Sequence, residues 1–242
     1  MISHFISDLH LCDEQPHLLR LFDHYMEVLA PEADRLYILG DLFETWVGDD
    51  DDASLARSVI DRLRAWSGAG GELYLMHGNR DFLIGDDFAR ATGGILLDDP
   101  HLMTLAGRPT LLMHGDTLCT DDTDYQQFRR MVRDPGWQRQ LLSQTLAVRR
   151  QLAAEIRGKS RAAMAGKDEA IMDVNDEAVS QVFREHGAGL LIHGHTHRPA
   201  VHQCQVNGTA CERWVLGDWG ERGNVLICGE EGELQSRWFA PE

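Results

Sequence analysis

Five short apolar runs, each ending in polar residues, constrain the fold of this chain more than any other feature. They are HFISDLHL, LYILGDLF, LYLMHGNRDF, TLLMHGDTL and LLIHGHTHRP. Uninterrupted apolar runs of this length are typical of strands buried on both faces. Between the first four runs, apolar residues recur at helical spacing, for example at Leu55, Val59, Leu63 and Trp66. Strands that alternate with helices predict a layered α/β fold.

The rest of the chain departs from this alternation in two places. RWVLGDWG, NVLICG and LQSRWFA are separated by glycine-rich turns and predict antiparallel strands that complete a second sheet. Residues from about 117 to 187 have mainly helical spacing, and we expect them to form a helical insertion that caps the strand ends. A helix that begins at Asn175 or Asp176 and ends at Gly187 should then return the chain to the body. We therefore expect one domain over residues 1–242, with the cap within it.

The net charge of −16 argues against broad nucleic-acid binding, which needs a basic face. The segment from Arg129 to Lys167 nevertheless holds ten lysines or arginines against two acids. It is either a solvated helix face or a platform for anionic lipid or phosphate. No run reaches the about 18 apolar residues of a spanning helix, so we expect a cytoplasmic protein, at most peripheral to a membrane. The five scattered cysteines should be reduced.

The same kinds of residue end all five predicted strands, and all of them can bind metals. In chain order they are Asp8 with His10, Asp41, Asn79, His114, and His195 with His197. Sheets of this class bind ligands outside the carboxyl ends of their strands, so we expect these side chains to converge. Nitrogen and oxygen donors without thiolate suit manganese, iron or zinc. Seven donors are too many for one tetrahedral ion, but with Asp41 as a bridge they form two sets of four.

Each of these residues alone has a simpler explanation. Asp8 and Asp41 could form turns or cap helices, and Asn79 after glycine is also a good turn residue. We interpret His193 as a core histidine or a support for the metal ligands. We interpret the run Asp49–Asp52 as the solvated start of the next helix, favoured by the helix dipole. The joint occurrence of the donors at five strand ends favours a metal site.

The ordered series D-x-H, GD, GNRD, HGD and GHTH resembles that of the calcineurin-like metallophosphoesterases. Within that family the chain is similar to the UDP-2,3-diacylglucosamine pyrophosphohydrolases of Gram-negative lipid A biosynthesis. FISDLHLC, LYILGDLFETWVGDDD, HGNRDFLIG, LLMHGDTLCTDD, AIMDVN and LIHGHTHRPAVH carry this resemblance, which covers nearly the whole chain. It implies an α/β fold with a two-sheet β-sandwich core flanked by helices (αββα) and a helical cap insertion.

The resemblance also implies the ligands and the reaction. One divalent ion, with Mn²⁺ expected, would be held by Asp8, His10, Asp41 and His197, and a second by Asp41, Asn79, His114 and His195. A metal-held hydroxide would attack the α-phosphorus of UDP-2,3-diacylglucosamine and give UMP and 2,3-diacylglucosamine 1-phosphate (lipid X). The enzyme would work peripherally on the cytoplasmic face of the inner membrane, where its lipid substrate lies.

The resemblance further assigns roles around the metals. Catalysis would involve Asp41, Asn79, Arg80 and His195, and the substrate would contact Asn79, Arg80, Asp122, Ser160, Lys167 and His195. Met164 stands where some members have an asparagine that contacts substrate. Arg80 stands where many relatives have histidine; its planar fork matches phosphate, so we expect it to favour pyrophosphates over simple monoesters.

Two other functions remain open from the sequence. The same site could serve another dinuclear-metal phosphodiesterase or a nucleotide pyrophosphatase, acting for example on dinucleoside polyphosphates or cyclic nucleotides. A long cap with an apolar groove is not needed for such soluble substrates. The chain could also be a non-catalytic scaffold, but nothing would then require all seven donors.

Overall fold

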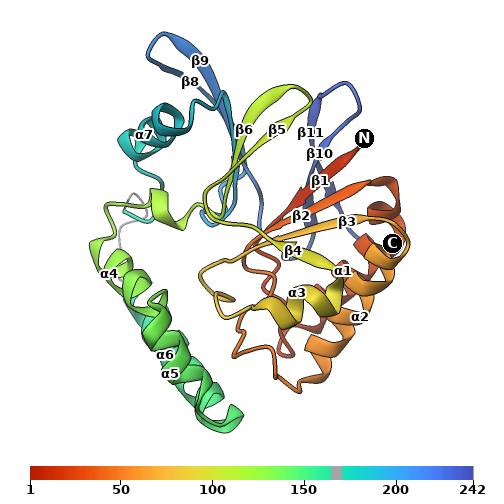
Figure 1. The fold of residues 1–242 in the computed structure, drawn as a ribbon, viewed down its shortest axis with the longest axis vertical. Coiled ribbons are helices and arrows are strands. Elements are labelled where there is room, and N and C mark those ends of the chain that lie inside the picture. The colour runs from red at the N-terminus through yellow and green to blue at the C-terminus, as the bar shows by residue number, and fades with distance from the viewer. Residues whose placement is uncertain (165–170, 242) are drawn as a thin grey trace.

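The chain folds into two stacked β-sheets (Figure 1). The computed structural model describes residues 1–164 and 171–241. The first sheet has the strand order β11-β10-β1-β2-β3-β4, and the second has β5-β6-β7-β9-β8. Parallel pairing in the first sheet joins β1 (Ser3–Ile6), β2 (Arg35–Leu39), β3 (Glu72–Met76) and β4 (Gly94–Leu96). Parallel pairing in the second joins β6 (Arg108–Met113), β7 (Leu190–His193) and β9 (Thr209–Val215), and its edges are the antiparallel strands β5 (His101–Leu105) and β8 (Ala200–Val206).

Successive residues of the central strands point into different apolar layers. In β1, Phe5 lies between the sheets, whereas Ile6 packs beneath α1 (Pro16–His24) and α2 (Ser54–Gly68). In β6, Leu112 lies between the sheets and Leu111 packs under α7 (Asp176–His186). The first sheet is covered by α1, α2 and α3 (Asp86–Thr92), and the second by α7 (Figure 1). The expected αββα arrangement is confirmed, and burial on both faces explains why the strands read as continuous apolar runs.

The helices follow the apolar spacing of the sequence, with local departures. After α1 the chain continues through a π-helical turn at Tyr25–Leu29 and a 3₁₀ turn at Ala30–Glu32, and a second 3₁₀ turn follows β6 at Asp116–Leu118. The expected bounds of α7 are confirmed. Asn175 Oδ1 accepts hydrogen bonds from the backbone N–H groups of Glu177 and Ala178, and Gly187 ends the helix with a φ of +61°.

The prediction for the C-terminal strands is wrong in part. Only β8 and β9 join the second sheet, while β10 (Gly223–Cys228) and β11 (Leu234–Phe239) extend the first. β10 pairs antiparallel with β1, where Leu226 lies opposite Phe5. An alternating pattern indicates that a strand pairs, but not with which strand. Here β10 covers the edge that β1 would otherwise expose. The sequence patterns also did not indicate α3 or the short strands β4 and β5.

Three helices form an arm that extends from the two-sheet body (Figure 1). They are α4 (Thr123–Val132), α5 (Pro135–Leu142) and α6 (Leu146–Met164). None of the described helices combines the length and the apolar composition needed to cross a membrane. Arg149 of α6 is only 3% exposed, donates to the backbone oxygen of Val47 at 2.6 Å and pairs with Asp50. Arg150 and Arg157 pair with other acids of the 44–52 loop. These three arginines attach the arm to the body, so they are not part of a purely solvated face.

The interpretation of Asp49–Asp52 as a solvated helix start is also wrong. The Asp49 carboxylate does not cap α2, the helix that follows it in the sequence. Its carboxylate instead accepts hydrogen bonds from the backbone N–H groups of Gly85 at 3.0 Å and Phe88 at 2.9 Å, and from Trp46 Nε1 at 3.1 Å. It thus caps α3, which is distant in sequence. Asp50 to Asp52 pair with α6.

We expect Asp49→Ala to lower the free energy of unfolding by about 1–2 kcal/mol, because the substitution leaves the first N–H groups of α3 without their acceptor. Asp52→Ala is the matched control, since Asp52 is exposed and its carboxylate caps no helix. Urea unfolding of both variants measures the difference. Equal stability of the two variants would contradict the capping role of Asp49.

Candidate functional site

The backbone conformation itself marks the candidate metal ligands. Seven non-glycine residues of the described chain have positive φ, and five of them belong to the predicted donor set: Asp8, His10, Asp41, His195 and His197, with φ between 50° and 69°. This conformation costs about 1–3 kcal/mol for a non-glycine residue and persists where the surrounding structure imposes it, as it does at functional sites. The other two, Ala106 and Asn207, each precede a glycine in a strand-to-strand turn.

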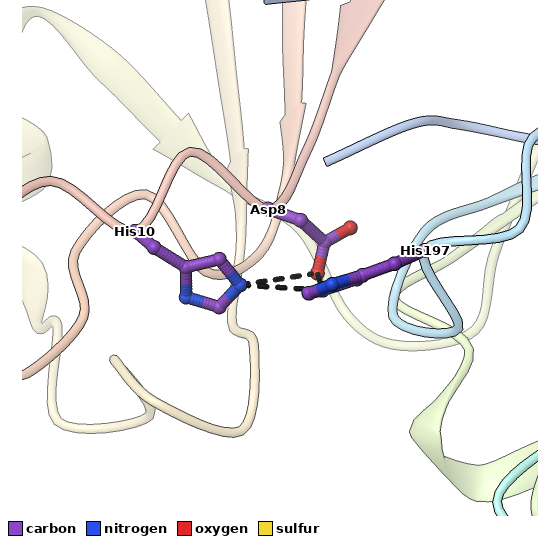
Figure 2. A group of neighbouring side chains, drawn as sticks. All are labelled: Asp8, His10 and His197. Atoms are coloured by element: carbon purple, nitrogen blue, oxygen red, sulfur yellow. Dashed lines mark hydrogen bonds and ion pairs between the residues drawn. The ribbon is translucent and has the colours of Figure 1, made fainter. Parts of the chain in front are cut away.

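The first predicted ligand set gathers where β1 and β7 end. Asp8 Oδ1 lies 3.3 Å from His197 Nε2 and 3.9 Å from His10 Nε2, and the two histidine nitrogens are 3.3 Å apart. Figure 2 shows these three side chains pointing toward one another, with Asp8 at the end of β1 and His197 on the loop after β7. Donor atoms this close can share one cation.

The second predicted set gathers beside the first. Asn79 Oδ1 lies 3.0 Å from both His114 Nε2 and His195 Nδ1. Asp41 joins the two sets, because its Oδ2 lies 3.9 Å from His10 Nε2 and its Oδ1 lies 3.9 Å from His114 Nε2. The structure thus brings together all seven predicted donors, and Asp41 presents one oxygen to each set.

The charges of the site favour a bound cation. Asp8 and Asp41 are 0% and 1% exposed, and their ion pairs within the described chain are with histidines alone. Burial raises the pKa of Asp41 to about 6. Burial opposes protonation of His114, but the nearby Asp41 and Asp8 carboxylates raise its pKa to about 9. Buried carboxylates need positive charge beside them, and mixed carboxylate and imidazole donors fit a divalent metal.

A layer of buried polar residues holds the ligands in place, and the sequence patterns did not single it out. Asp81 accepts hydrogen bonds from the backbone N–H groups of Leu42 and Gly78 at 2.8 Å and of Asp41 at 3.3 Å, and so fixes the two loops against each other. Its place in the GNRD motif was the signal that could have identified it. A side chain at position 78 would lie 2.0 Å from Asp41 Oδ1, so only glycine fits there.

His193 lies beneath the loop that carries His195 and His197, as expected for a residue one step deeper on the strand. Burial, and secondarily Arg213, lower the pKa of His193 to about 3, so the ring is neutral. Its Nε2 accepts a hydrogen bond from Arg213 at 3.1 Å, and its Nδ1 donates to the backbone oxygen of Gly194 at 2.8 Å. His193 therefore supports the ligand loop from within the core.

A cavity of about 470 Å³ opens from the donor set toward the arm. At one end it is lined by donors of both predicted sets, among them Asp41, Asn79 and His195. Along the arm it is lined mainly by apolar side chains, which include Phe128, Trp137, Leu141, Leu152 and Ile156, and on the body by Trp46, Val47, Phe82 and Leu83. The cavity therefore joins a charged end to an apolar one.

The predicted substrate-contacting residues lie partly on this cavity. Arg80, Asp122 and Ser160 line it. The backbone N–H of Arg80 also donates to Asp41 Oδ1 at 2.8 Å. Asp122 caps α4 by accepting from the backbone N–H of Tyr125 at 3.1 Å. Lys167 lies outside the described residues, and so does the side chain of Met164.

The two-sheet fold and the paired donor sets define a class of protein, the metallophosphoesterases. Comparison of the sequence with known proteins agrees with this class. The calcineurin-like phosphoesterase model matches residues 4–199, and the chain belongs to this family. Over 241 residues it is 53% identical to a UDP-2,3-diacylglucosamine hydrolase of Chromohalobacter salexigens, covering 99% of this chain and 98% of that protein. A protein of the same name from Cellvibrio japonicus is 48% identical, with 97% and 98% covered. The solved structure of an archaeal phosphodiesterase matches with a TM-score of 0.49 and 11% identity over 99% of this chain and 100% of that one.

Proposed function

We propose that this protein hydrolyses the pyrophosphate bond of UDP-2,3-diacylglucosamine and yields UMP and 2,3-diacylglucosamine 1-phosphate (lipid X) in lipid A biosynthesis. The observation that carries the proposal is the cavity, which joins a cluster of metal-binding donors to a long apolar lining. The substrate has the same division, with a pyrophosphate at one end and two acyl chains at the other. The names of relatives 53% and 48% identical to this chain support the assignment.

Two divalent cations, with Mn²⁺ preferred, complete the proposed site. One would be held by Asp8, His10, Asp41 and His197, and the other by Asp41, Asn79, His114 and His195. When bound, such ions would neutralise phosphoryl oxygens. They would also lower the pKa of a water molecule, so that hydroxide is available at near-neutral pH. The chain's own contribution is to hold the donors in strained loops and to keep the Asp8 and Asp41 carboxylates buried.

Arg80 and His195 act on the reacting phosphoryl group. The Arg80 guanidinium lines the cavity beside Asn79, where its fork can bind the charge that develops on phosphate oxygens. Burial lowers the pKa of His195 to about 4, so its imidazole is neutral and can bind a metal without first losing a proton. A sugar phosphate is already a good leaving group, so Arg80 needs to donate no proton.

The arm supplies the contacts to the rest of the lipid. Asp122, Ser160 and Lys167 are the proposed partners of the sugar, phosphate and acyl amide region. The apolar arm lining takes the acyl chains. Met131, Leu142 and Val148 expose 41–48% of their surface on the same arm, which supports peripheral contact with the cytoplasmic face of the inner membrane, where the substrate lies. No nucleic acid is a proposed partner.

The proposal is tested by UMP release from UDP-2,3-diacylglucosamine with purified protein, with Mn²⁺ and with chelator. We expect metal-dependent release. Faster hydrolysis of diadenosine polyphosphates would favour the rival nucleotide pyrophosphatase, and inactivity toward all phosphoesters would favour a scaffold. An alkyl phosphate tests the role of Arg80, because turnover equal to that of the lipid would contradict its preference for pyrophosphate.

We expect Asp41→Ala to reduce turnover more completely than Asn79→Ala. Asp41 presents oxygens to both ligand sets, whereas Asn79 belongs to one, so the second variant keeps a complete first set. Steady-state rates and the bound Mn²⁺ per chain measure the difference. Comparable residual rates and metal contents would count against a bridging role for Asp41.

We expect Ala153→Phe to lower kcat/KM for the diacylated substrate by about 5–150-fold, the equivalent of about 1–3 kcal/mol of overpacking. Ala153 lines the cavity on α6. Ala147→Phe is the matched control, because this alanine of the same helix is exposed and does not line this cavity. Hydrolysis of a small chromogenic phosphodiester should be unchanged in both variants. An equal loss on both substrates would show that the residue acts on the donors instead of on the acyl chains.

A further inference from the structure

Glu44 lies between a candidate metal ligand and the arm, and each of its carboxylate oxygens has a different partner. Glu44 Oε2 is 2.9 Å from His10 Nδ1, and Glu44 Oε1 accepts from the Arg157 guanidinium at 2.6 Å. The side chain is 17% exposed. The backbone N–H of Glu44 donates to the oxygen of Leu11 at 3.2 Å, which fixes this residue beside the loop that carries His10.

The contact to His10 determines how that ring is presented. With Nδ1 facing a carboxylate, the proton stays on Nδ1 and the lone pair of Nε2 is available to a metal. Nε2 is also the atom that lies 3.9 Å from both Asp8 Oδ1 and Asp41 Oδ2. The close approach of Glu44 therefore favours the tautomer and the ring orientation in which Nε2 faces the two carboxylates.

The contact to Arg157 connects this arrangement to the cavity. Arg157 is on α6, whose residues Leu152, Ile156 and Ser160 line the cavity. A shift of α6 that separated Arg157 from Glu44 would free one carboxylate oxygen and would allow the carboxylate to turn away from His10. Of the three arginines that attach α6 to the 44–52 loop, Arg157 is the one whose acidic partner also contacts a candidate ligand.

We propose that Glu44 is a positioning residue that couples the seating of α6 to the orientation of His10, so that the arm and the first metal set are linked. The proposal rests on the proposed role of His10 as a metal ligand. By reciprocity, a ligand that holds α6 against the body strengthens metal binding, and metal binding strengthens the seating of α6.

Binding of Mn²⁺ alone to the full chain, measured by titration calorimetry, tests this coupling without any substrate. We expect Glu44→Ala to weaken one of the two binding events by about 10–100-fold, the usual effect of removing the partner of a metal-binding histidine. Arg157→Met should weaken the same event by a smaller factor, and Arg157→Lys should restore part of the loss because it keeps the charge beside Glu44.

Arg150→Met is the matched control. Arg150 is on the same helix and pairs with Asp51 and Asp52 of the same loop, but those acids contact none of the seven donors. Wild-type Mn²⁺ affinity in Glu44→Ala would overturn the proposal, and so would an equal loss in Arg150→Met and Arg157→Met. If Glu44→Ala does not fold, judged by circular dichroism, Glu44→Met replaces it, because methionine has a similar length and offers no oxygen acceptor, and wild-type affinity in that variant would overturn the proposal equally. Because no substrate is used, failure of the UMP assay leaves this result unaffected.

Discussion

The structure depends on the burial of two carboxylates, Asp8 and Asp41, whose ion-pair partners among the described residues are histidines alone. Such burial is costly unless positive charge is supplied. The surrounding features hold the donors in place around these carboxylates: strained turns aim the histidines inward, Asp81 fixes two loops against each other, and a glycine at position 78 lets the backbone approach Asp41.

Much of this arrangement could be predicted from the sequence, because it depends on short local sequence patterns. Buried strands read as apolar runs, and each donor follows its strand directly, so Asp8, Asn79 and His195 could be named before any fold was known. The sheet that β10 and β11 join could not be predicted, since alternation does not specify a partner. Neither could the capping of α3 by Asp49, which depends on a contact 36 residues along the chain.

For the arm too, the local sequence patterns could be interpreted, but the contacts between distant residues could not be predicted. Its helices and its excess of basic residues were visible in the sequence, and either a solvated face or an anion platform was consistent with them. Three of those arginines form ion pairs with acids of the body and so attach the arm to it. The arm's apolar residues line the cavity because that attachment places α6 beside the strand ends. Basic residues of one segment can therefore form ion pairs with acids of the same chain.

Each ligand set takes donors from both sheets: Asp8 and His10 from the first with His197 from the second, and Asn79 from the first with His114 and His195 from the second. A cation in either set would therefore act as a cross-link between the two halves of the sandwich. Asp8 and His197 are 189 residues apart, so the link would close a loop of most of the chain, and long closed loops are the ones whose closure most restricts an unfolded polypeptide. Binding of a cation would then also raise the temperature at which this protein unfolds.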